Sequence, residues 1–197
     1  MRNFHPKLMI KYLSEKWQSP SYARKESNKW LHPTCRNIKG DVLSIGSGND
    51  TDNEGDYYRN YFPMATSYTT SEISEEFECD VTIDVRSMPE IKDESYDCVY
   101  CSGVLEHVDD YQAGFSEFTR ILKAGGILLL GVPFHQPIHF GSQDFWRFTE
   151  HGIKYLLKDS YEIIDIVSID QRRGTEFPSA YWIKARKKKH NQEFVDY

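Results

Sequence analysis

Residues 42–45 form a short apolar run that ends directly in Gly46-Ser47-Gly48. A strand followed at once by such a turn is typical of the start of a strand–helix–strand unit. Glycine lets the backbone turn sharply and lets a ligand approach closely, because it has no Cβ atom. Gly-x-Gly alone is weak evidence, but its place after the first apolar strand predicts a ligand-binding turn at the start of an α/β domain.

Six further segments have the composition of strands, and helical patterns separate several of them. Residues 126–132 are almost unbroken in apolar character, which is typical of a parallel strand buried on both faces. Aromatic residues recur at helical spacing before this segment, and Gly125-Gly126 predicts the end of that helix. The last two segments have no helical pattern between them, so we expect an antiparallel pair. The strands are expected at residues 42–45, 64–70, 80–83, 96–101, 126–132, 162–169 and 180–185.

This order of elements predicts an α/β fold, with a doubly wound, mostly parallel sheet, an antiparallel edge hairpin and helices on both faces. Ligands of such sheets bind beyond the carboxyl ends of the strands. We expect a helical extension over residues 1–39, which packs on the core, one domain over residues 40–189 and a tail over residues 190–197. Within the extension, residues 33–40 are expected to be a connector.

The chain has 197 residues and a formal net charge of −6, and an acidic protein repels a phosphate backbone unless its basic residues gather on one face. We interpret the basic run at residues 184–189 as a solvated chain end and expect no nucleic-acid partner. No segment has the length and apolar character of a signal peptide or a membrane span, which predicts a cytoplasmic protein. Cys98 and Cys101 are three residues apart on one strand and point to opposite faces, so we expect buried structural cysteines and no metal site.

Polar or small residues follow three of the expected strands. Glu72 ends the second strand, and a carboxylate in that place accepts hydrogen bonds from ribose hydroxyls in nucleoside sites. Asp84 closes the third strand and can accept a hydrogen bond from an adenine amino group, while Val85 packs on the ring. Ser102 and Gly103 follow the fourth strand and leave room for an extended arm of a cofactor. These residues together predict a nucleoside cofactor site.

Three segments carry a resemblance to a known family. They are residues 42–48, Val-Leu-Ser-Ile-Gly-Ser-Gly, residues 96–108, which end in Val-Leu-Glu-His-Val, and residues 120–126, Arg-Ile-Leu-Lys-Ala-Gly-Gly. In this order they resemble the small class I S-adenosylmethionine-dependent methyltransferases, over residues 40–185. The resemblance implies a seven-stranded Rossmann-like sheet, S-adenosylmethionine as the methyl donor and S-adenosylhomocysteine as the product.

The resemblance also implies roles for single residues. The chain departs from the family pattern at Ser44, where an acidic residue is usual, and at Asp50, where a third glycine is usual. These departures keep open a non-catalytic binding or partner protein of the same fold. A nicotinamide-dependent dehydrogenase is disfavoured because Thr51 interrupts a full Gly-x-Gly-x-x-Gly motif. The implied cofactor residues are Gly46, Ser47 and Gly48 on the methionine side, Glu72 at the ribose, Asp84 and Val85 at the adenine, and Ser102 and Gly103 near the sulfonium.

Methyl transfer to a hydroxyl needs in-line alignment and a base that takes the proton. His107, after the fourth strand, and His139, after the fifth, are the candidate bases, because neutral histidine accepts a proton at physiological pH. His135 lies on the same loop as His139 and is a candidate for acceptor recognition. A metal site formed by these loop histidines with Asp144 is disfavoured, because nothing else completes the set of ligands.

Residues 144–149, Asp-Phe-Trp-Arg-Phe-Thr, resemble a segment of family members that act near sugar and cell-surface polysaccharide pathways. This implies O-methylation of a small-molecule or sugar-linked acceptor. Asp144, Trp146 and Arg147 are the further candidates for acceptor recognition: the indole can stack on a sugar face, and the guanidinium can bind a phosphate or carboxylate. A structural clasp between Asp144 and Arg147 is the competing interpretation.

Overall fold

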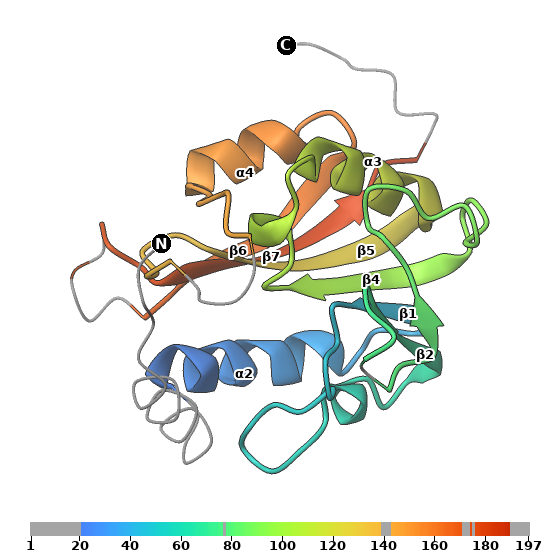
Figure 1. The fold of residues 1–197 in the computed structure, drawn as a ribbon, viewed down its shortest axis with the longest axis horizontal. Coiled ribbons are helices and arrows are strands. Elements are labelled where there is room, and N and C mark those ends of the chain that lie inside the picture. Colours follow the sequence, from blue (N-terminus) through green and yellow to red (C-terminus); the bar gives the residue numbers. More distant parts are fainter. Residues whose placement is uncertain (1–20, 77, 139–142, 171–173, 175, 190–197) are drawn as a thin grey trace.

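The computed structural model describes residues 21–76, 78–138, 143–170, 174 and 176–189, and the statements below concern these residues. They form three layers, in which one long helix covers one face of a twisted sheet and two helices cover the other (Figure 1). The long helix is α2 Tyr22–Cys35, and the two helices on the other face are α3 Tyr111–Ile121 and α4 Glu150–Leu157. There are also two short 3₁₀ turns in the described residues, η1 Tyr58–Tyr61 and η2 Leu105–His107.

The sheet has seven strands in the order β3-β2-β1-β4-β5-β7-β6. The first five strands of the chain run parallel to one another, whereas β7 is antiparallel to both β5 and β6. The expected Rossmann-like fold with an antiparallel edge pair is therefore confirmed. The strands are β1 Gly40–Ile45, β2 Ala65–Glu72, β3 Val81–Thr82, β4 Tyr96–Ser102, β5 Leu122–Pro133, β6 Tyr161–Ile169 and β7 Ala180–Lys187.

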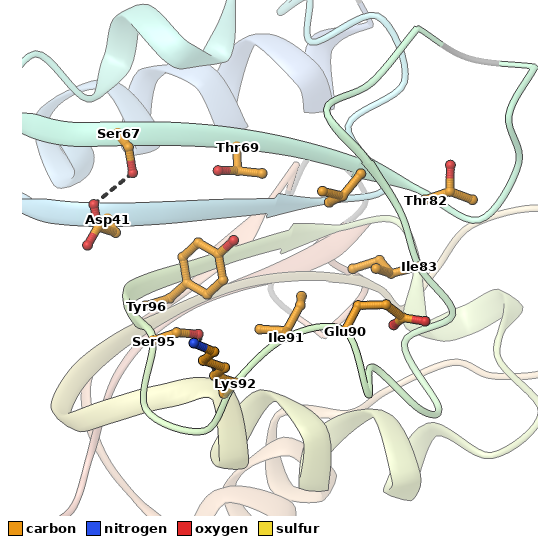
Figure 2. A pocket seen from close by; sticks show the side chains of 11 residues that line it. Asp41, Ser67, Thr69, Thr82, Ile83, Glu90, Ile91, Lys92, Ser95 and Tyr96 are labelled. Carbon is orange, nitrogen blue, oxygen red and sulfur yellow. Dashed lines mark hydrogen bonds between the residues drawn. The ribbon is translucent and has the colours of Figure 1, made fainter.

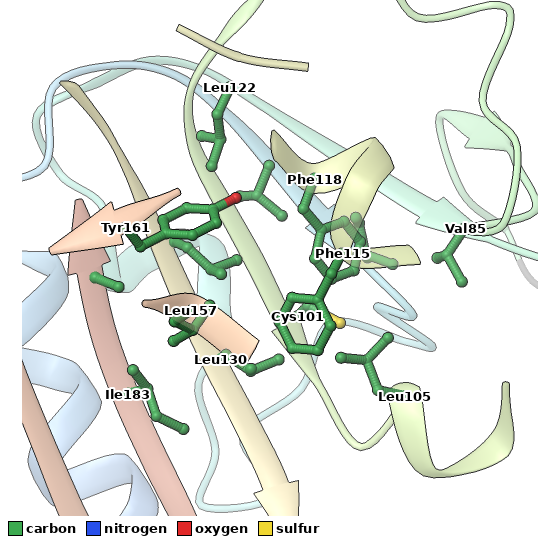
Figure 3. Close-up of a cluster of buried hydrophobic side chains, with 14 of the residues drawn as sticks. Val85, Cys101, Leu105, Phe115, Phe118, Leu122, Leu130, Leu157, Tyr161 and Ile183 are labelled. Atoms are coloured by element: carbon green, nitrogen blue, oxygen red, sulfur yellow. The ribbon is translucent and has the colours of Figure 1, made fainter. Parts of the chain in front are cut away.

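The central strands are buried on both faces, as the apolar run in β5 predicts. Leu130 joins the core under α3 and α4, whereas Leu129 joins the core under α2. Cys101 and Cys98 divide between the same two cores, so their thiols point to opposite faces. Figure 3 shows the α3 side, where Phe118 packs over the sheet among fully buried aliphatic side chains. Each such side chain stabilises the fold by roughly 2 kcal/mol when it leaves water.

Strand ends differ from the prediction by one or two residues in most cases, and two helix ends differ by more. α2 continues into the expected connector at residues 33–40 and ends at Cys35, because that residue is fully buried in the core under the helix. At the other boundary, α3 ends before Leu122, which begins β5, so Gly125-Gly126 does not close the helix. These glycines instead lie in β5, where Gly125 has a left-handed φ of +82°.

The described part of the N-terminal extension packs against the sheet. Trp182 of β7 donates from its indole nitrogen to the Ser27 hydroxyl at 2.8 Å, and its ring lies 5.8 Å from the ring of Trp30. Residues 1–20 and 190–197 lie outside the described residues, so the division into extension, domain and tail stays a prediction. No helix in the described part of the chain has the length and apolar character needed to cross a membrane.

Candidate functional site

The glycine turn lies at the carboxyl end of β1 and contacts the carboxylate that ends β2. Gly46 and Gly48 have φ values of +65° and +52°, a region that side-chain-bearing residues rarely adopt. A Cβ atom on Gly46 would lie 2.2 Å from Cγ2 of Val104, so no larger residue fits there. The Gly48 amide donates to Oε1 of Glu72 at 2.7 Å. The turn and Glu72, predicted separately, therefore form one structure.

A cavity of about 520 Å³ opens beside this turn, at the carboxyl ends of β1, β2 and β4. Its walls combine apolar side chains, among them Ile83 and Val85, with the carboxylates of Glu72 and Asp84. Arg86 donates to Asp84 through Nε and Nη2, and these hydrogen bonds lower the pKa of the Asp84 carboxyl. This cavity therefore combines an apolar lining with the hydrogen-bond acceptors of two carboxylates.

A smaller chamber of about 330 Å³ adjoins the cavity. The two spaces share Gly46, Gly103 and His107 in their walls, and the chamber reaches Ser44 on the α2 side of the sheet. Arg24 of α2 also lines the chamber and donates to the Tyr58 hydroxyl at 2.8 Å. Each of the eight predicted cofactor residues lines the larger cavity, the smaller chamber or both: Gly46, Ser47, Gly48, Glu72, Asp84, Val85, Ser102 and Gly103.

Glu106, in the turn η2, is a buried carboxylic acid in the wall of the chamber. It is 3% exposed, and its Oε2 atom has no hydrogen-bond partner among the described residues. Burial raises the pKa of this carboxyl above its ordinary value. The segment after β5 covers the residue, because the Glu106 carbonyl accepts hydrogen bonds from the amides of Phe145 and Trp146 at 2.7 and 3.3 Å. A buried polar atom without a hydrogen-bond partner costs stability, and such groups gather at functional sites.

His107 lines both spaces, as expected for a residue at the site. Its Nδ1 lies 2.6 Å from the carbonyl oxygen of Gln143. A carbonyl can only accept, so Nδ1 carries the proton, and the lone pair of the neutral ring is on Nε2. Nε2 lies 3.9 Å from Oε1 of Glu106. The imidazole is thus held in one orientation, with its basic nitrogen beside the buried carboxyl.

The residues predicted to recognise an acceptor are engaged in contacts within the protein. Arg147 donates to both carboxylate oxygens of Asp144, from Nη2 at 2.8 Å, and also to the carbonyls of Gln136 and Pro137. The Asp144 side chain is only 2% exposed. This geometry favours the clasp over recognition of an acceptor by the guanidinium.

The indole of Trp146 also packs against the protein. Its Nε1 donates to the carbonyl of Val108 at 2.8 Å, and its ring lies edge-on to Tyr111 at 5.0 Å. His135 is exposed, and its ring lies 5.8 Å from that of Phe177, away from both spaces. His139 lies outside the described residues. Of the candidate bases, the structure therefore describes His107 alone.

The chamber also contains residues that the sequence prediction did not place at the site, among them Arg24, Tyr58, Tyr100 and Glu106. Arg24 precedes the buried residues Ser27 and Asn28 by one helical turn, so the spacing along α2 was a usable signal. No comparable signal marks Glu106, because its burial depends on residues about 40 positions later in the chain.

Asp50, one of the two departures from the family pattern, does not line either space. It adopts a left-handed φ of +57°, as the glycine usual there would. Its buried carboxylate accepts hydrogen bonds from Nε of Arg59 and from the hydroxyl of Tyr68, both at 2.9 Å. The Asp50 carboxylate therefore has its hydrogen-bond partners within the protein. Ser44, the other departure, lines the chamber.

A third cavity, of about 570 Å³, lies along β1 and β2 and beside the start of β4 (Figure 2). Asp41 accepts a hydrogen bond from the Ser67 hydroxyl at 2.7 Å on one side, and Ile91 and Tyr96 lie on the other. It contains none of the predicted site residues. Size alone therefore does not identify the site in this fold.

Comparison with known proteins gives a match to one family model and a fold. Residues 43–130 match the family model of a methyltransferase domain. No curated protein sequence matches the chain. The matched region begins in β1 and ends in β5, so it contains the glycine turn, Glu72, Asp84 and His107.

Several solved structures have the same fold at low sequence identity. The 1,6-didemethyltoxoflavin-N1-methyltransferase of Burkholderia thailandensis, solved with S-adenosylhomocysteine and its substrate, has a TM-score of 0.65 and 16% identity, over 93% of this chain and 87% of that one. An S-adenosylmethionine-dependent methyltransferase of Mesorhizobium loti has a TM-score of 0.61 and 14% identity, over 81% and 96%. One from Methanosarcina mazei has a TM-score of 0.59 and 17% identity, over 79% and 96%.

The family model and the site agree. The model covers the strands whose carboxyl ends build the cavity and the chamber, and the solved structures share the sheet that holds them. Residues 43–130 therefore match a methyltransferase domain in sequence, and the chain has the fold of solved S-adenosylmethionine-dependent methyltransferases.

Proposed function

We propose that this methyltransferase acts on a hydroxyl oxygen of a small-molecule or sugar-linked acceptor, with His107 as the base. The observation that carries the proposal is the orientation of His107, which lines both spaces and whose Nδ1 is held by the Gln143 carbonyl. An oxygen acceptor needs such a base, because a hydroxyl is a poor nucleophile until its proton leaves.

The residues present fit S-adenosylmethionine. Val85 and Ile83 suit an adenine ring, Asp84 suits its amino group, and Glu72 suits the ribose hydroxyls. Gly46 and Gly48 line the chamber and carry no Cβ atom, which leaves room for the methionine arm. When bound, S-adenosylmethionine supplies an activated methyl group on a positively charged sulfur and leaves as S-adenosylhomocysteine.

The methionine arm carries a carboxylate, and the chamber offers a matching cation. Arg24 lines the chamber together with Ser47 and Gly48 and does not line the larger cavity. Its guanidinium is held by the Tyr58 hydroxyl, which in turn donates to Asn28 at 3.1 Å. We assign Arg24 as the partner of the methionyl carboxylate, a contact that would join α2 to the cofactor site.

Support for an oxygen acceptor comes from the base and from the resemblance of residues 144–149 to members that act on sugars. The neighbours in fold do not decide it, because one is an N-methyltransferase and another carries out C-methylation. The acceptor class therefore needs a direct test.

Transfer of a radiolabelled methyl group from S-adenosylmethionine to a panel of sugars, nucleotide sugars, phenols and amines would test the proposal. We expect label on hydroxyl acceptors, a large loss in His107→Ala and no loss in His151→Ala, whose histidine is exposed on α4. Label on amines alone, or full turnover in His107→Ala, would refute the proposal. If S-adenosylmethionine bound in titration calorimetry, bound less tightly to Glu72→Ala, and labelled no acceptor, the non-catalytic alternative would be favoured.

A further inference from the structure

Glu106 is a buried carboxyl whose Oε2 atom has no hydrogen-bond partner among the described residues. Among the described residues, its only ion pair is with His107, at 3.9 Å. The nearest arginine on the covering segment, Arg147, already donates to both oxygens of Asp144. An ionised carboxylate left in this position would cost several kcal/mol unless a positive charge entered the chamber.

The surroundings of Glu106 come from four parts of the fold. A Cβ atom on Gly103 would lie 3.6 Å from Oε1, so the carboxyl is directed along the wall that the cavity and the chamber share. Its position beside Nε2 of His107 puts it next to the base of the proposed reaction. The titratable and charged groups that face it are His107 of the same turn, Cys101 of β4, Asp144 and Arg147 of the covering segment, and Arg24 of α2.

We propose that Glu106 is the counter-ion of the charge that moves during the reaction, paired with the sulfonium of the methyl donor before transfer and with protonated His107 after it. This inference rests on the proposed function. It assigns Glu106 as a residue that selects the charged donor over the neutral product, a role separate from that of the base.

The charge balance of the reaction explains why one carboxylate can serve both states. The acceptor oxygen bonds to the methyl carbon while the electron pair of the carbon–sulfur bond stays on sulfur, and the hydroxyl proton passes to Nε2 of His107. The positive charge therefore leaves sulfur and appears on the imidazole. Glu106 lies 3.9 Å from Nε2, so it is already placed against the charge that forms. The imidazolium then returns its proton to solvent.

The proposal predicts a difference between donor and product. S-adenosylmethionine carries the sulfonium charge, whereas S-adenosylhomocysteine has a neutral sulfur and is otherwise the same except for the methyl group. Neutralising Glu106 should therefore weaken binding of the donor on the order of 10-fold and binding of the product less than about 3-fold. The reason is that a charge pair in a partly buried site is worth more than 1 kcal/mol. The same selectivity would favour release of the product.

Titration calorimetry of three probes with wild type, Glu106→Gln and Glu162→Gln tests this. The probes are S-adenosylmethionine, S-adenosylhomocysteine and sinefungin, an analogue that carries an amine in place of the methylsulfonium. Glu162 is exposed on β6 and serves as the matched control. We expect Glu106→Gln to weaken the binding of S-adenosylmethionine and sinefungin but to leave the affinity for S-adenosylhomocysteine nearly unchanged. Near-UV circular dichroism checks that the variant is folded.

Three outcomes would overturn the inference. Equal weakening of all three probes would assign Glu106 to the methionyl ammonium, which all of them carry, and unchanged affinities would remove it from the site. Neither outcome would contradict the proposed function, because wild type would still bind the donor and the transfer assay tests the reaction separately. Failure of wild type to bind any probe would overturn the proposed function together with the inference.

Discussion

Replacing Arg147 by alanine should destabilise the fold more than it affects cofactor binding. The change removes two hydrogen bonds to Asp144, whose side chain is 2% exposed, and the donors to the carbonyls of Gln136 and Pro137. Breaking a buried ion pair by removing one partner costs about 3–5 kcal/mol. The Arg147 side chain is 24% exposed, so water can partly replace it, and we expect the lower end, about 3 kcal/mol.

Urea denaturation of the wild type, the two single alanine variants and the double variant measures this pair directly. The double-mutant cycle should give a coupling of about 2 kcal/mol between Arg147 and Asp144, and the melting temperature of Arg147→Ala should fall by roughly 6–12 °C. The exposed pair of Lys154 and Glu150 on α4 is the control, with an expected coupling below about 0.5 kcal/mol.

The clasp and the recognition hypotheses then give different results. If Arg147→Ala unfolds at the same urea concentration as wild type but raises KM for the acceptor many-fold, the structural reasoning is wrong and the guanidinium binds substrate. If stability falls as calculated while the affinity for S-adenosylhomocysteine is kept, the clasp is supported. In that case its function is to hold the segment that covers Glu106.

Three further changes test the cofactor side. Gly46→Ala should abolish binding of S-adenosylhomocysteine in a folded protein, since the new Cβ meets Val104 at 2.2 Å, and calorimetry with intact circular dichroism would check this. Glu72→Gln should weaken the binding of S-adenosylhomocysteine by about 10-fold, because the glutamine side chain is a poorer acceptor for the ribose hydroxyls and for the backbone N–H of Gly48. An unchanged affinity would contradict the assignment of Glu72 to the ribose. Burial raises the pKa of Glu106 in the folded protein above the ordinary pKa of glutamate. The free energy of unfolding of unliganded wild type should therefore fall as the pH rises from the ordinary pKa through the raised pKa. The free energy of unfolding of Glu106→Gln should fall less over the same pH range.

The sequence predicted the fold well because the information is local. The apolar runs, the glycine turn and the spacing of aromatic residues each lie within about ten positions, and the sheet follows from their order. The boundaries that failed were decided by packing between distant parts. Cys35 extends α2 because it is buried under the sheet, and no local pattern around Pro33 could indicate this.

The site was predictable to the extent that its residues follow strands. The residues expected at the cofactor, such as Glu72 and Ser102, line the two spaces because parallel strands end at one edge. The residues that the sequence missed come from elements that cross this edge from elsewhere. Arg24 arrives from α2, and Glu106 is enclosed only when residues 145–146 fold over it.

The departures at Ser44 and Asp50 raised the possibility that the cofactor site had been lost, and their positions argue against that. Asp50 keeps the left-handed backbone of the glycine that it replaces and directs its carboxylate to Arg59 and Tyr68, outside both spaces. Ser44 does remove a carboxylate from the chamber wall, but Glu106 lines the same chamber and supplies one. The chamber therefore retains one carboxyl group, which comes from the turn after β4 that also holds His107.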